Sequence, residues 1–464
     1  MPLVLSESAH VRVPRAIVGM VAEPAAHGAG HNEAALMSNL QETDRHSHNP
    51  LVRYFRILGP GLVTGASDDD PSGITTYSVA GAALGYGMLW TALATFPLMA
   101  AVQLICARIG LVTGRGLAGT IRRHYPRPFL YVACLLLLVA NVFNIAADLA
   151  GMADATRLLT GVPSLVSVPG FGLVILLATV YMTYARFAQY LKWLTAVLFA
   201  YVIAAFLAKP DWRQVAVAIL VPSPRWDALY VTTLVAVLGT TISPYLFFWQ
   251  ASQEVEEEKA RGRRTVAQRR GATAHELADA RLDVATGMFL SNLVMFFIML
   301  ATAATLHRAG RVQIETARQA ADALRPLAGD AAYLLFALGL IGTGFLAVPV
   351  LAGSASFAVA EVFGWRAGLD LSPRRGRRFY LVFAGAVAAG MLLDLAGTNP
   401  IRMLFLSAVL NGLLAPPLLL LVMLVSNNRA IMGEHANGPW LNVLGWAATV
   451  VMSLAAVAFF ATSL

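Results

Sequence analysis

The chain has few charged residues and few cysteines, and both shortages narrow its class. Charged residues make up 13% of the 464, against about 25% in a typical soluble domain. Hydrophobic residues make up 58%, and the mean hydropathy is +0.65. Cys106 and Cys134 both lie within apolar segments, so the sequence suggests neither a disulfide framework nor a metal cluster. We therefore expect an all-α, polytopic membrane protein.

The sequence also lacks the patterns of an enzyme. It contains no Ser/His/Asp set, no phosphate-binding loop and no Cys/His cluster, so we predict no catalytic activity and no cofactor. The net charge of +8 would suit a nucleic-acid partner. However, the basic residues fall in loops between apolar segments, which makes them a topology signal. We expect no nucleic-acid partner, and the sequence does not give the oligomeric state.

Residues 1–50 lack an apolar stretch long enough for a signal peptide and contain five of the nine histidines. We predict a disordered cytoplasmic tail, followed by a transporter domain over 51–464. The tail histidines either scavenge metal or belong to a solvated segment without a fixed site. A second charged segment, 254–282, carries a glutamate run followed by arginines. We predict that it is a charged helix extending the preceding span into the cytoplasm.

Eleven apolar runs have about the 20-residue length of a membrane-spanning helix. An odd number of spans places the two termini on opposite sides. With a cytoplasmic N-terminus, 25 of the 34 Lys and Arg residues fall on the cytoplasmic side, which predicts this orientation in a bacterial inner membrane. The expected spans are approximately 58–84, 87–110, 129–151, 170–188, 190–208, 228–253, 284–306, 332–360, 378–396, 400–426 and 441–463.

Two polar breaks interrupt the first and the sixth of these spans. The first is Asp70-Pro71-Ser72-Gly73, and the second runs from Thr240 to Tyr245 around Pro244. Each proline removes a backbone donor and opens the helix, which is tolerated in a bilayer around a watery cavity or an ion. Spans 1–5 (about 58–208) and 6–10 (about 228–426) then form two units that each open with a broken helix. This is the plan of a LeuT-like 5+5 inverted repeat with a midplane site. The helix at about 441–463 is additional.

Three consecutive acids, Asp68, Asp69 and Asp70, lie inside the first span. A charge at the membrane centre costs about 3 kcal/mol or more, so we expect these side chains to line water or an ion. Pairing with an arginine is the alternative, but spans 1–8 contain no basic residue near the membrane centre. Asp69 and Asp68 are expected to act as neighbours of the site, or as proton carriers.

The sequence resembles the Nramp divalent-metal transporters over nearly its whole membrane portion. Typical Nramps carry Asp-Pro-Gly-Asn in the first break and Met-Pro-His in the second, and their Asp, Asn and Met side chains contact the metal. Here Asp70 is retained, whereas Ser72, Gly73, Ser243 and Tyr245 replace the other residues of those two motifs. The stretches that carry the resemblance include Gly59-Pro60-Gly61, Ala107-Arg108-Ile109-Gly110-Leu111-Val112-Thr113-Gly114-Arg115, Asp148-Leu149-Ala150, Ser291-Asn292, Leu406-Ser407 and Met432-Gly433-Glu434.

The resemblance implies a metal site built from oxygen donors. Without the thioether, the site should favour a hard cation, Mg²⁺ or Mn²⁺, over soft metals. The direction of this change is similar to that in the Nramp-related magnesium transporters. The expected donors are the side chains of Asp70 and Ser243 and the carbonyls of Ile242 and Thr241, with Asp69 and Ser72 nearby.

The family's proton route is depleted in this chain. The span 3 pattern Asp-Leu-Ala-Glu reads Asp148-Leu149-Ala150-Gly151, and Tyr245 replaces the histidine of span 6. Asn144 and Asp148 lie one helical turn apart. This polar stripe, together with Asn411, is either a relay or interhelical hydrogen-bond glue. Asp68 and Tyr245 complete the candidate pathway.

We therefore predict a transporter of a hard divalent cation that works by alternating access with weak or no proton coupling. Two alternatives remain. One is a sodium- or proton-coupled carrier of a small organic solute, in which the half-helix N-termini bind a carboxylate and Asp70 holds sodium. The other is a non-transporting, Nramp-like receptor.

Overall fold

The computed structural model describes residues 53–54, 57–182, 196–394 and 397–463, and this part of the chain contains helices and no strand. Residues 57–464 form one compact unit. The predicted tail, 1–50, lies outside the described residues. The division into a tail and a transporter domain therefore stays a prediction. The all-α, LeuT-like fold class is confirmed.

Eight helical segments are long and apolar enough to cross a membrane. A shorter apolar helix, Val197–Leu207, lies within the fifth predicted span. The two remaining predicted spans correspond to the broken first span and to the 18-residue α19. The spans consist of α3 (Pro60–Asp68) with α4 (Pro71–Leu84), α5 (Trp90–Thr113), α7 (Arg127–Thr160), α8 (Ser164–Tyr181), α10 (Ala200–Leu207), α12 (Ala228–Thr241) with α13 (Pro244–Ala260), α15 (Ala274–Thr302), α18 (Ala332–Phe363), α19 (Arg377–Asp394), α20 (Pro400–Asn427) and α22 (Pro439–Ser463).

Both predicted breaks are present. The first separates α3 from α4 at Asp69 and Asp70, and the second separates α12 from α13 at Ile242 and Ser243. In each case a proline occupies the first position of the following helix. Proline fits that position because its missing N–H group would have no intrahelical partner there. The same proline cannot continue the helix before it.

Three boundary predictions were wrong, among them the start of the seventh span, expected at 284 but found at Ala274. The third span, expected at 129–151, continues to Thr160, and the fourth begins at Ser164 rather than near residue 170. Alanine, leucine and arginine in 153–159 are good helix formers, and they extend α7 until Gly161 ends it in a left-handed conformation.

The expected charged helix over 254–282 is also partly wrong. α13 continues to Ala260, but Gly262 has a φ of +89°. A short α14 (Val266–Arg269) and then the start of α15 at Ala274 fill the rest. Glycine adopts a positive φ without strain and is a poor helix former, so Gly262 favours a turn here over a continuous helix.

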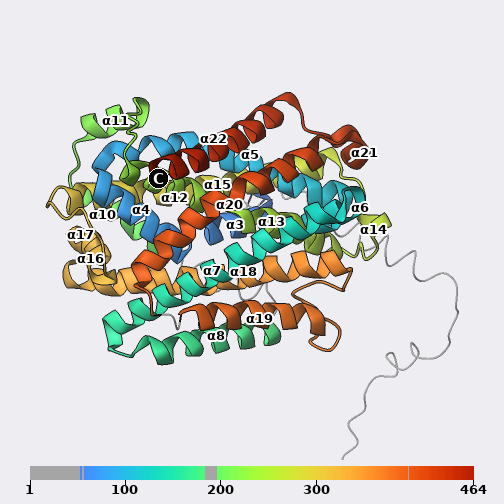
Figure 1. Cartoon of the computed structure of the whole chain (residues 1–464), viewed down its shortest axis with the longest axis horizontal. Helices are drawn as coiled ribbons and strands as arrows, with labels where there is room; N and C mark the ends of the chain where they lie inside the picture. Colours follow the sequence, from blue (N-terminus) through green and yellow to red (C-terminus); the bar gives the residue numbers. More distant parts are fainter. Residues whose placement is uncertain (1–52, 55–56, 183–195, 395–396, 464) are drawn as a thin grey trace, which may run out of the picture. The chain divides into compact units, whose positions relative to one another are not determined.

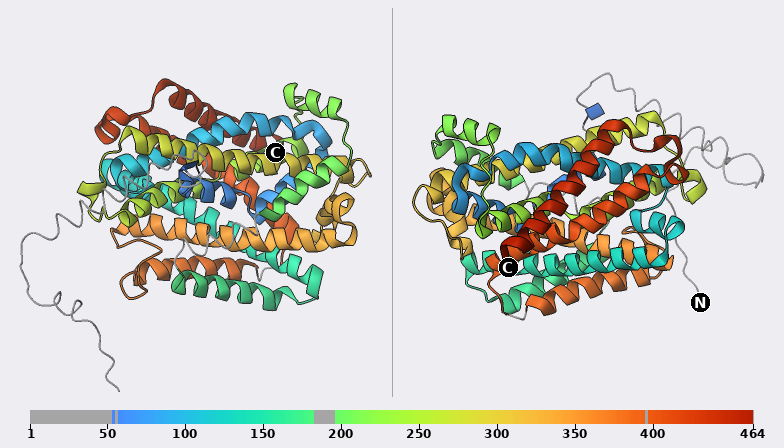
Figure 2. Two further views of the ribbon diagram at one scale, coloured as in Figure 1. Left: turned by 180° about the vertical axis from the view of Figure 1, so that it is seen from behind. Right: turned by 45° about the horizontal axis from the view of Figure 1, so that its top comes forward.

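The spans pack in two groups. α7, α18, α19 and α8 lie side by side, whereas α3, α4, α5, α13 and α15 form a second group (Figure 1). α12 packs mainly on α20 and also contacts α4 of the second group. α20 packs against both α12 and α7, and α22 lies across α20, α12 and α5 (Figure 2). Parts of both broken spans belong to the second group, which brings their breaks together.

Close backbone contact fixes the position of the first broken span. A Cβ atom at Gly65 would lie 2.2 Å from the carbonyl oxygen of Gly287 on α15, so only glycine fits. Asp283, also on α15, accepts hydrogen bonds from the N–H groups of Gly59 (2.8 Å), Gly61 (2.6 Å) and Leu62 (3.0 Å). This carboxylate satisfies donors that the N-terminus of α3 leaves without partners.

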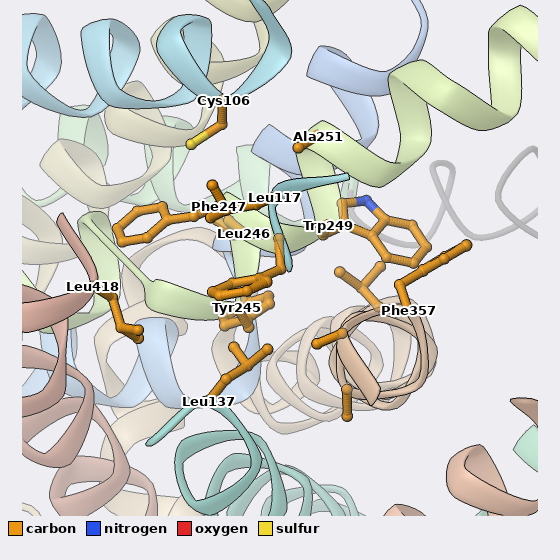
Figure 3. Close-up of a cluster of buried hydrophobic side chains, with 14 of the residues drawn as sticks. Cys106, Leu117, Leu137, Tyr245, Leu246, Phe247, Trp249, Ala251, Phe357 and Leu418 are labelled. Atoms are coloured by element: carbon orange, nitrogen blue, oxygen red, sulfur yellow. The ribbon is translucent and has the colours of Figure 1, made fainter. Parts of the chain in front are cut away.

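The second broken span is held by the apolar side chains of α13. Figure 3 shows Tyr245, Leu246, Phe247 and Trp249 spreading from this helix toward neighbouring ones. Trp249 meets Phe357 of α18 edge to face, with ring centroids 6.2 Å apart. Aromatic pairs in this geometry contribute about 0.5–1.5 kcal/mol beyond the burial of their area.

Short helices gather at the two ends of the spans. α6 (Leu117–His124), α14 and α21 (Arg429–Met432) lie toward one end in Figure 1. α10, α11 (Trp212–Leu220), α16 (Ala317–Ala321) and α17 (Arg325–Ala328) lie toward the other.

Candidate functional site

The two helix breaks meet. The hydroxyl of Tyr245, at the start of α13, donates to the carbonyl oxygen of Ser67, near the end of α3, at 2.8 Å. On the other halves of the spans, a Cβ atom at Gly73 of α4 would lie 3.1 Å from Oγ1 of Thr240 on α12. Contacts therefore cross between the two breaks on both sides.

Asp70 lies where α4 begins. Its backbone is extended (φ −70°, ψ 171°), and its Oδ1 atom accepts the N–H of Gly73 at 2.6 Å as the N-cap of α4. The Tyr245 side chain and the backbone N–H of Ser72 also interact with this carboxylate. The Asp70 side chain is 2% exposed. Asp70 thus has a fixed carboxylate orientation at the first break.

Asp68 and Asp69 share one donor. The hydroxyl of Ser291 on α15 lies 2.8 Å from Oδ2 of Asp68 and 3.2 Å from Oδ1 of Asp69. One hydroxyl proton cannot serve both carboxylates at once. Oδ1 of Asp68 is buried without a hydrogen-bond partner. The acidic triplet is therefore short of donors.

No basic residue compensates these acids. Asp68, Asp69 and Asp70 are all buried, and none takes part in an ion pair with another described residue. Ionised carboxylates without a partner are costly at membrane depth, so protons or a bound cation must compensate them. The alternative, pairing with an arginine, is not seen in the described part of the chain.

Asp148 adds a fourth carboxylate. It lies on α7, is fully buried, and neither of its oxygens has a hydrogen-bond partner. It interacts electrostatically with Asp70 and faces the backbone N–H of Ser72. Gly151, one turn later, faces Pro71: a Cβ atom there would lie 3.5 Å from that ring. Asp148 therefore belongs to the same polar region as the first break.

The second break offers oxygen atoms of α12. The hydroxyl of Ser243 lies 2.7 Å from the Thr240 carbonyl and 3.0 Å from the Gly239 carbonyl, as donor. That bond leaves the lone pairs of its oxygen free to accept or to coordinate. The Thr241 hydroxyl bonds back to the Val237 carbonyl at 2.9 Å. The Thr241 carbonyl belongs to the last turn of α12, where carbonyls have no intrahelical partner. Ile242 ends the helix with φ −118° and ψ 60°, and its carbonyl is free of the helical pattern.

The other predicted residues contact α20. Ser72 donates toward the carbonyl of Leu404 at 3.0 Å and lies 2.9 Å from the hydroxyl of Ser407. Asn144 and Asn411 exchange two amide hydrogen bonds, of 2.8 and 3.1 Å. This reciprocal pair joins α7 to α20, as interhelical hydrogen-bond glue does. Neither contact reaches the second break.

The fold thus gathers most of the predicted site residues at the two breaks, namely Asp70, Asp69, Asp68, Tyr245, Ser243, Ile242 and Thr241. Asp148 and Ser72 lie beside them. The described residues contain no group of three or more His, Cys, Asp or Glu side chains in a metal-binding arrangement. Any cation here would depend on hydroxyl and carbonyl oxygens as well as on carboxylates. The roles predicted for these residues stay predictions.

Four residues at the site were not singled out from the sequence as site residues. Ser291 bonds the acidic triplet, and Ser407 bonds Ser72. Thr240 lies against Gly73, and the buried hydroxyl of Tyr77 has no hydrogen-bond partner. Ser291 and Ser407 belong to stretches that resemble the family, and this resemblance could have identified them as candidate site residues. Tyr77 and Thr240 gave none beyond their closeness to the breaks.

Known structures share this architecture. A manganese transporter of Eremococcus coleocola matches with a TM-score of 0.70 over 90% of this chain and 88% of that one, at 19% sequence identity. A Na⁺-coupled sialic acid symporter matches with a TM-score of 0.52 over 85% of this chain and 88% of that one, at 14% identity. At these identities the likeness is one of fold.

Sequence comparison gives a more specific result. The "Divalent metal cation transporter MntH" of Pectobacterium carotovorum is 29% identical over 400 residues, which is 84% of this chain and 90% of that protein. The protein of the same name from Klebsiella pneumoniae is 28% identical over 86% of this chain and 92% of its own length. The "Natural resistance-associated macrophage protein-like" profile matches residues 61–462, so the chain belongs to the Nramp family.

Proposed function

We propose that this protein is a divalent metal cation transporter that works by alternating access. The observation that carries the proposal is Asp70, a buried carboxylate at the meeting point of two broken helices. Such breaks hold the midplane ion site in secondary transporters. The relatives named as divalent metal cation transporters support the substrate class.

We further propose that the substrate is a hard divalent cation, Mg²⁺ or Mn²⁺. The donors would be the carboxylate of Asp70, the hydroxyl of Ser243 and the carbonyls of Ile242 and Thr241, with Asp69 and Ser72 beside them. All are oxygen atoms, which these two cations prefer. Retained waters would complete the coordination, since Mg²⁺ loses its hydration shell reluctantly.

Proton coupling would be weak or absent. A proton relay needs a succession of titratable groups. Typical Nramps carry a carboxylate and an imidazole at two positions that are occupied here by Gly151 and Tyr245. Asn144 and Asn411 bond each other, which favours a structural role for this pair. The remaining candidate carriers are Asp70, its neighbours Asp68 and Asp69, and Asp148. Transport would then be driven by the ion gradient and by the potential across a bacterial inner membrane, with the N-terminus in the cytoplasm.

Uptake into proteoliposomes tests the proposal. Asp70→Ala removes the carboxylate at the meeting point of the two breaks, and we expect uptake of Mg²⁺ or Mn²⁺ to drop by tenfold or more, about 1.4 kcal/mol per decade. Asp154→Asn on α7, whose carboxylate bonds the N–H of Ala317 away from the breaks, is the matched control and should retain uptake. Equal uptake by wild type and Asp70→Ala would contradict the site. Sodium-dependent uptake of an organic solute, without metal uptake, would contradict the function.

A further inference from the structure

A cavity lined by charged residues lies away from the two helix breaks, at the far end of α13. Its volume is about 780 Å³, within the range of small-molecule sites. Its walls come from four segments: the turn after α5 with α6, the end of α13, the loop around α14, and the turn after α18. Figure 1 shows α6 and α14 at the same end of the spans. We call this space the basic cavity.

The basic cavity carries an excess of positive charge. Six of its lining residues are basic and three are acidic. The acidic ones are Glu256, Glu361 and Asp370. The basic ones are Arg115, Arg122, Lys259, Arg264, Arg269 and Arg366.

Two of the three acidic groups are already engaged. Glu256 forms an ion pair with Lys259 on the next turn of α13. Glu361, on α18, accepts the backbone N–H groups of Gly116 (3.0 Å) and Gly119 (2.8 Å) at the start of α6. These contacts stabilise the fold and partly neutralise the two carboxylates. Asp370 is the remaining acid.

One arginine is also structural. Arg269 is 5% exposed and donates to the carbonyl oxygens of Gly114, Arg263 and Arg264. Its position stabilises the loop around α14 against the turn after α5. It therefore helps to form a wall rather than a free binding group.

Three arginines of the wall remain, since Arg122 donates to the backbone carbonyl of Glu361. The side chains of Arg115, Arg264 and Arg366 form no hydrogen bond or ion pair with another described residue. They come from three different segments of the wall. A guanidinium group presents a planar pair of donors that matches phosphate oxygens.

We propose that the basic cavity binds a phosphate-bearing anion through Arg115, Arg264 and Arg366. The loops that line it carry most of the basic residues that predict the cytoplasmic face, where anionic lipid headgroups and soluble phosphorylated molecules are both available. Their shared chemistry is the phosphate group.

The position of the basic cavity gives the anion an effect on transport, and this step rests on the proposed function. α13 begins at the second break and ends at the cavity. α18 lines the cavity through Glu361 and bonds the Tyr245 carbonyl through Ser354, at 2.8 Å. These helices belong to different packing groups, whose relative movement alternating access requires. An anion that bridges them should slow transport.

Binding is tested on the full-length purified protein, without reference to transport. Pyrophosphate is titrated by calorimetry, and dioleoyl phosphatidylglycerol is compared with phosphatidylcholine in nanodiscs by the melting temperature. The double variant Arg115→Gln/Arg366→Gln should weaken pyrophosphate binding by about tenfold or more. Arg123→Gln, an exposed position on α6 that does not line the cavity, is the matched control and should bind as wild type does.

Each outcome decides the proposal. Binding of pyrophosphate that the double variant loses supports a soluble phosphate ligand. Stabilisation by phosphatidylglycerol alone, lost in the same variant, supports a lipid headgroup. The absence of both effects, or an equal loss in Arg123→Gln, overturns the site.

A transport assay then separates the two proposals. The anion should lower the cation uptake rate by twofold or more in wild type and leave the double variant unchanged. Binding without a change in uptake overturns the regulatory step alone. Absence of cation uptake in every sample counts against the proposed function and leaves the binding result intact.

Discussion

The hydroxyl of Tyr245 donates to the carbonyl oxygen of Ser67 at 2.8 Å, and this bond joins the two broken spans across their breaks. Ser67 lies near the end of α3, and Tyr245 is the second residue of α13. The carbonyl belongs to the last turn of α3, which has no successor in its own helix. A carbonyl group left unpaired by the break in the first repeat therefore accepts a hydrogen bond from a side chain of the second repeat.

Removing this hydroxyl should loosen the site. We expect Tyr245→Phe to lower the free energy of unfolding by about 1 kcal/mol and the melting temperature by a few degrees. A thermal melt of the detergent-solubilised protein measures the change. Tyr131→Phe, an exposed tyrosine on α7, should melt as wild type does. Equal melting of all three proteins would argue against the bond.

A soft ligand at the second break should change the selectivity. Ser243→Met places a thioether where the family pattern has one, so the affinity for Cd²⁺ should rise relative to that for Mg²⁺. Competition by Cd²⁺ for transport measures the ratio. A ratio that does not change would mean that the side chain at position 243 does not face the ion.

The cap on α3 predicts a large effect on stability. Asp283 accepts three backbone N–H groups, and Asp283→Asn exchanges a charged acceptor for a neutral amide. The expected loss is about 1–3 kcal/mol, read as a lower melting temperature. Asp279→Asn, one turn earlier and paired with His275 near the surface, is the control. A melting temperature as low for Asp279→Asn as for Asp283→Asn would contradict the capping role.

Several elements followed from the sequence. Prolines at 71 and 244 predicted both breaks, because proline begins a helix well and continues one poorly. The acidic triplet predicted the polar region, since charges are rare at membrane depth. The ends of α7 and α13 could not be predicted in the same way. The length of an apolar run indicates which residues lie in the membrane, but not where the helix ends.

The hydrogen bonds that join distant segments of the chain at the site could not be predicted from the sequence. The sequence places Ser291 more than 200 residues from Asp68 and Asp69, and only the packing of α15 on α3 brings them to 2.8 and 3.2 Å. The pairing of Asn144 with Asn411 depends in the same way on how α7 crosses α20. Such contacts are set by tertiary packing rather than by local pattern.

The weak or absent coupling of cation transport to protons provides a further prediction. A membrane potential supplies about 2.3 kcal/mol per charge per 100 mV, so an imposed inside-negative potential should drive the cation into proteoliposomes without acidifying their lumen. A pH-sensitive dye in the lumen measures proton entry. Acidification that follows cation uptake and disappears in Asp148→Asn would restore Asp148 as a proton relay.

Calorimetry of the purified protein tests the central claim, an oxygen-only cation site at Asp70, most directly. Titration with Mg²⁺, Mn²⁺, Ca²⁺ and Cd²⁺ should give one site that binds Mg²⁺ or Mn²⁺, with little preference for Cd²⁺. Asp70→Ala should weaken binding by tenfold or more. A strong preference for Cd²⁺, or binding that Asp70→Ala leaves unchanged, would contradict the account.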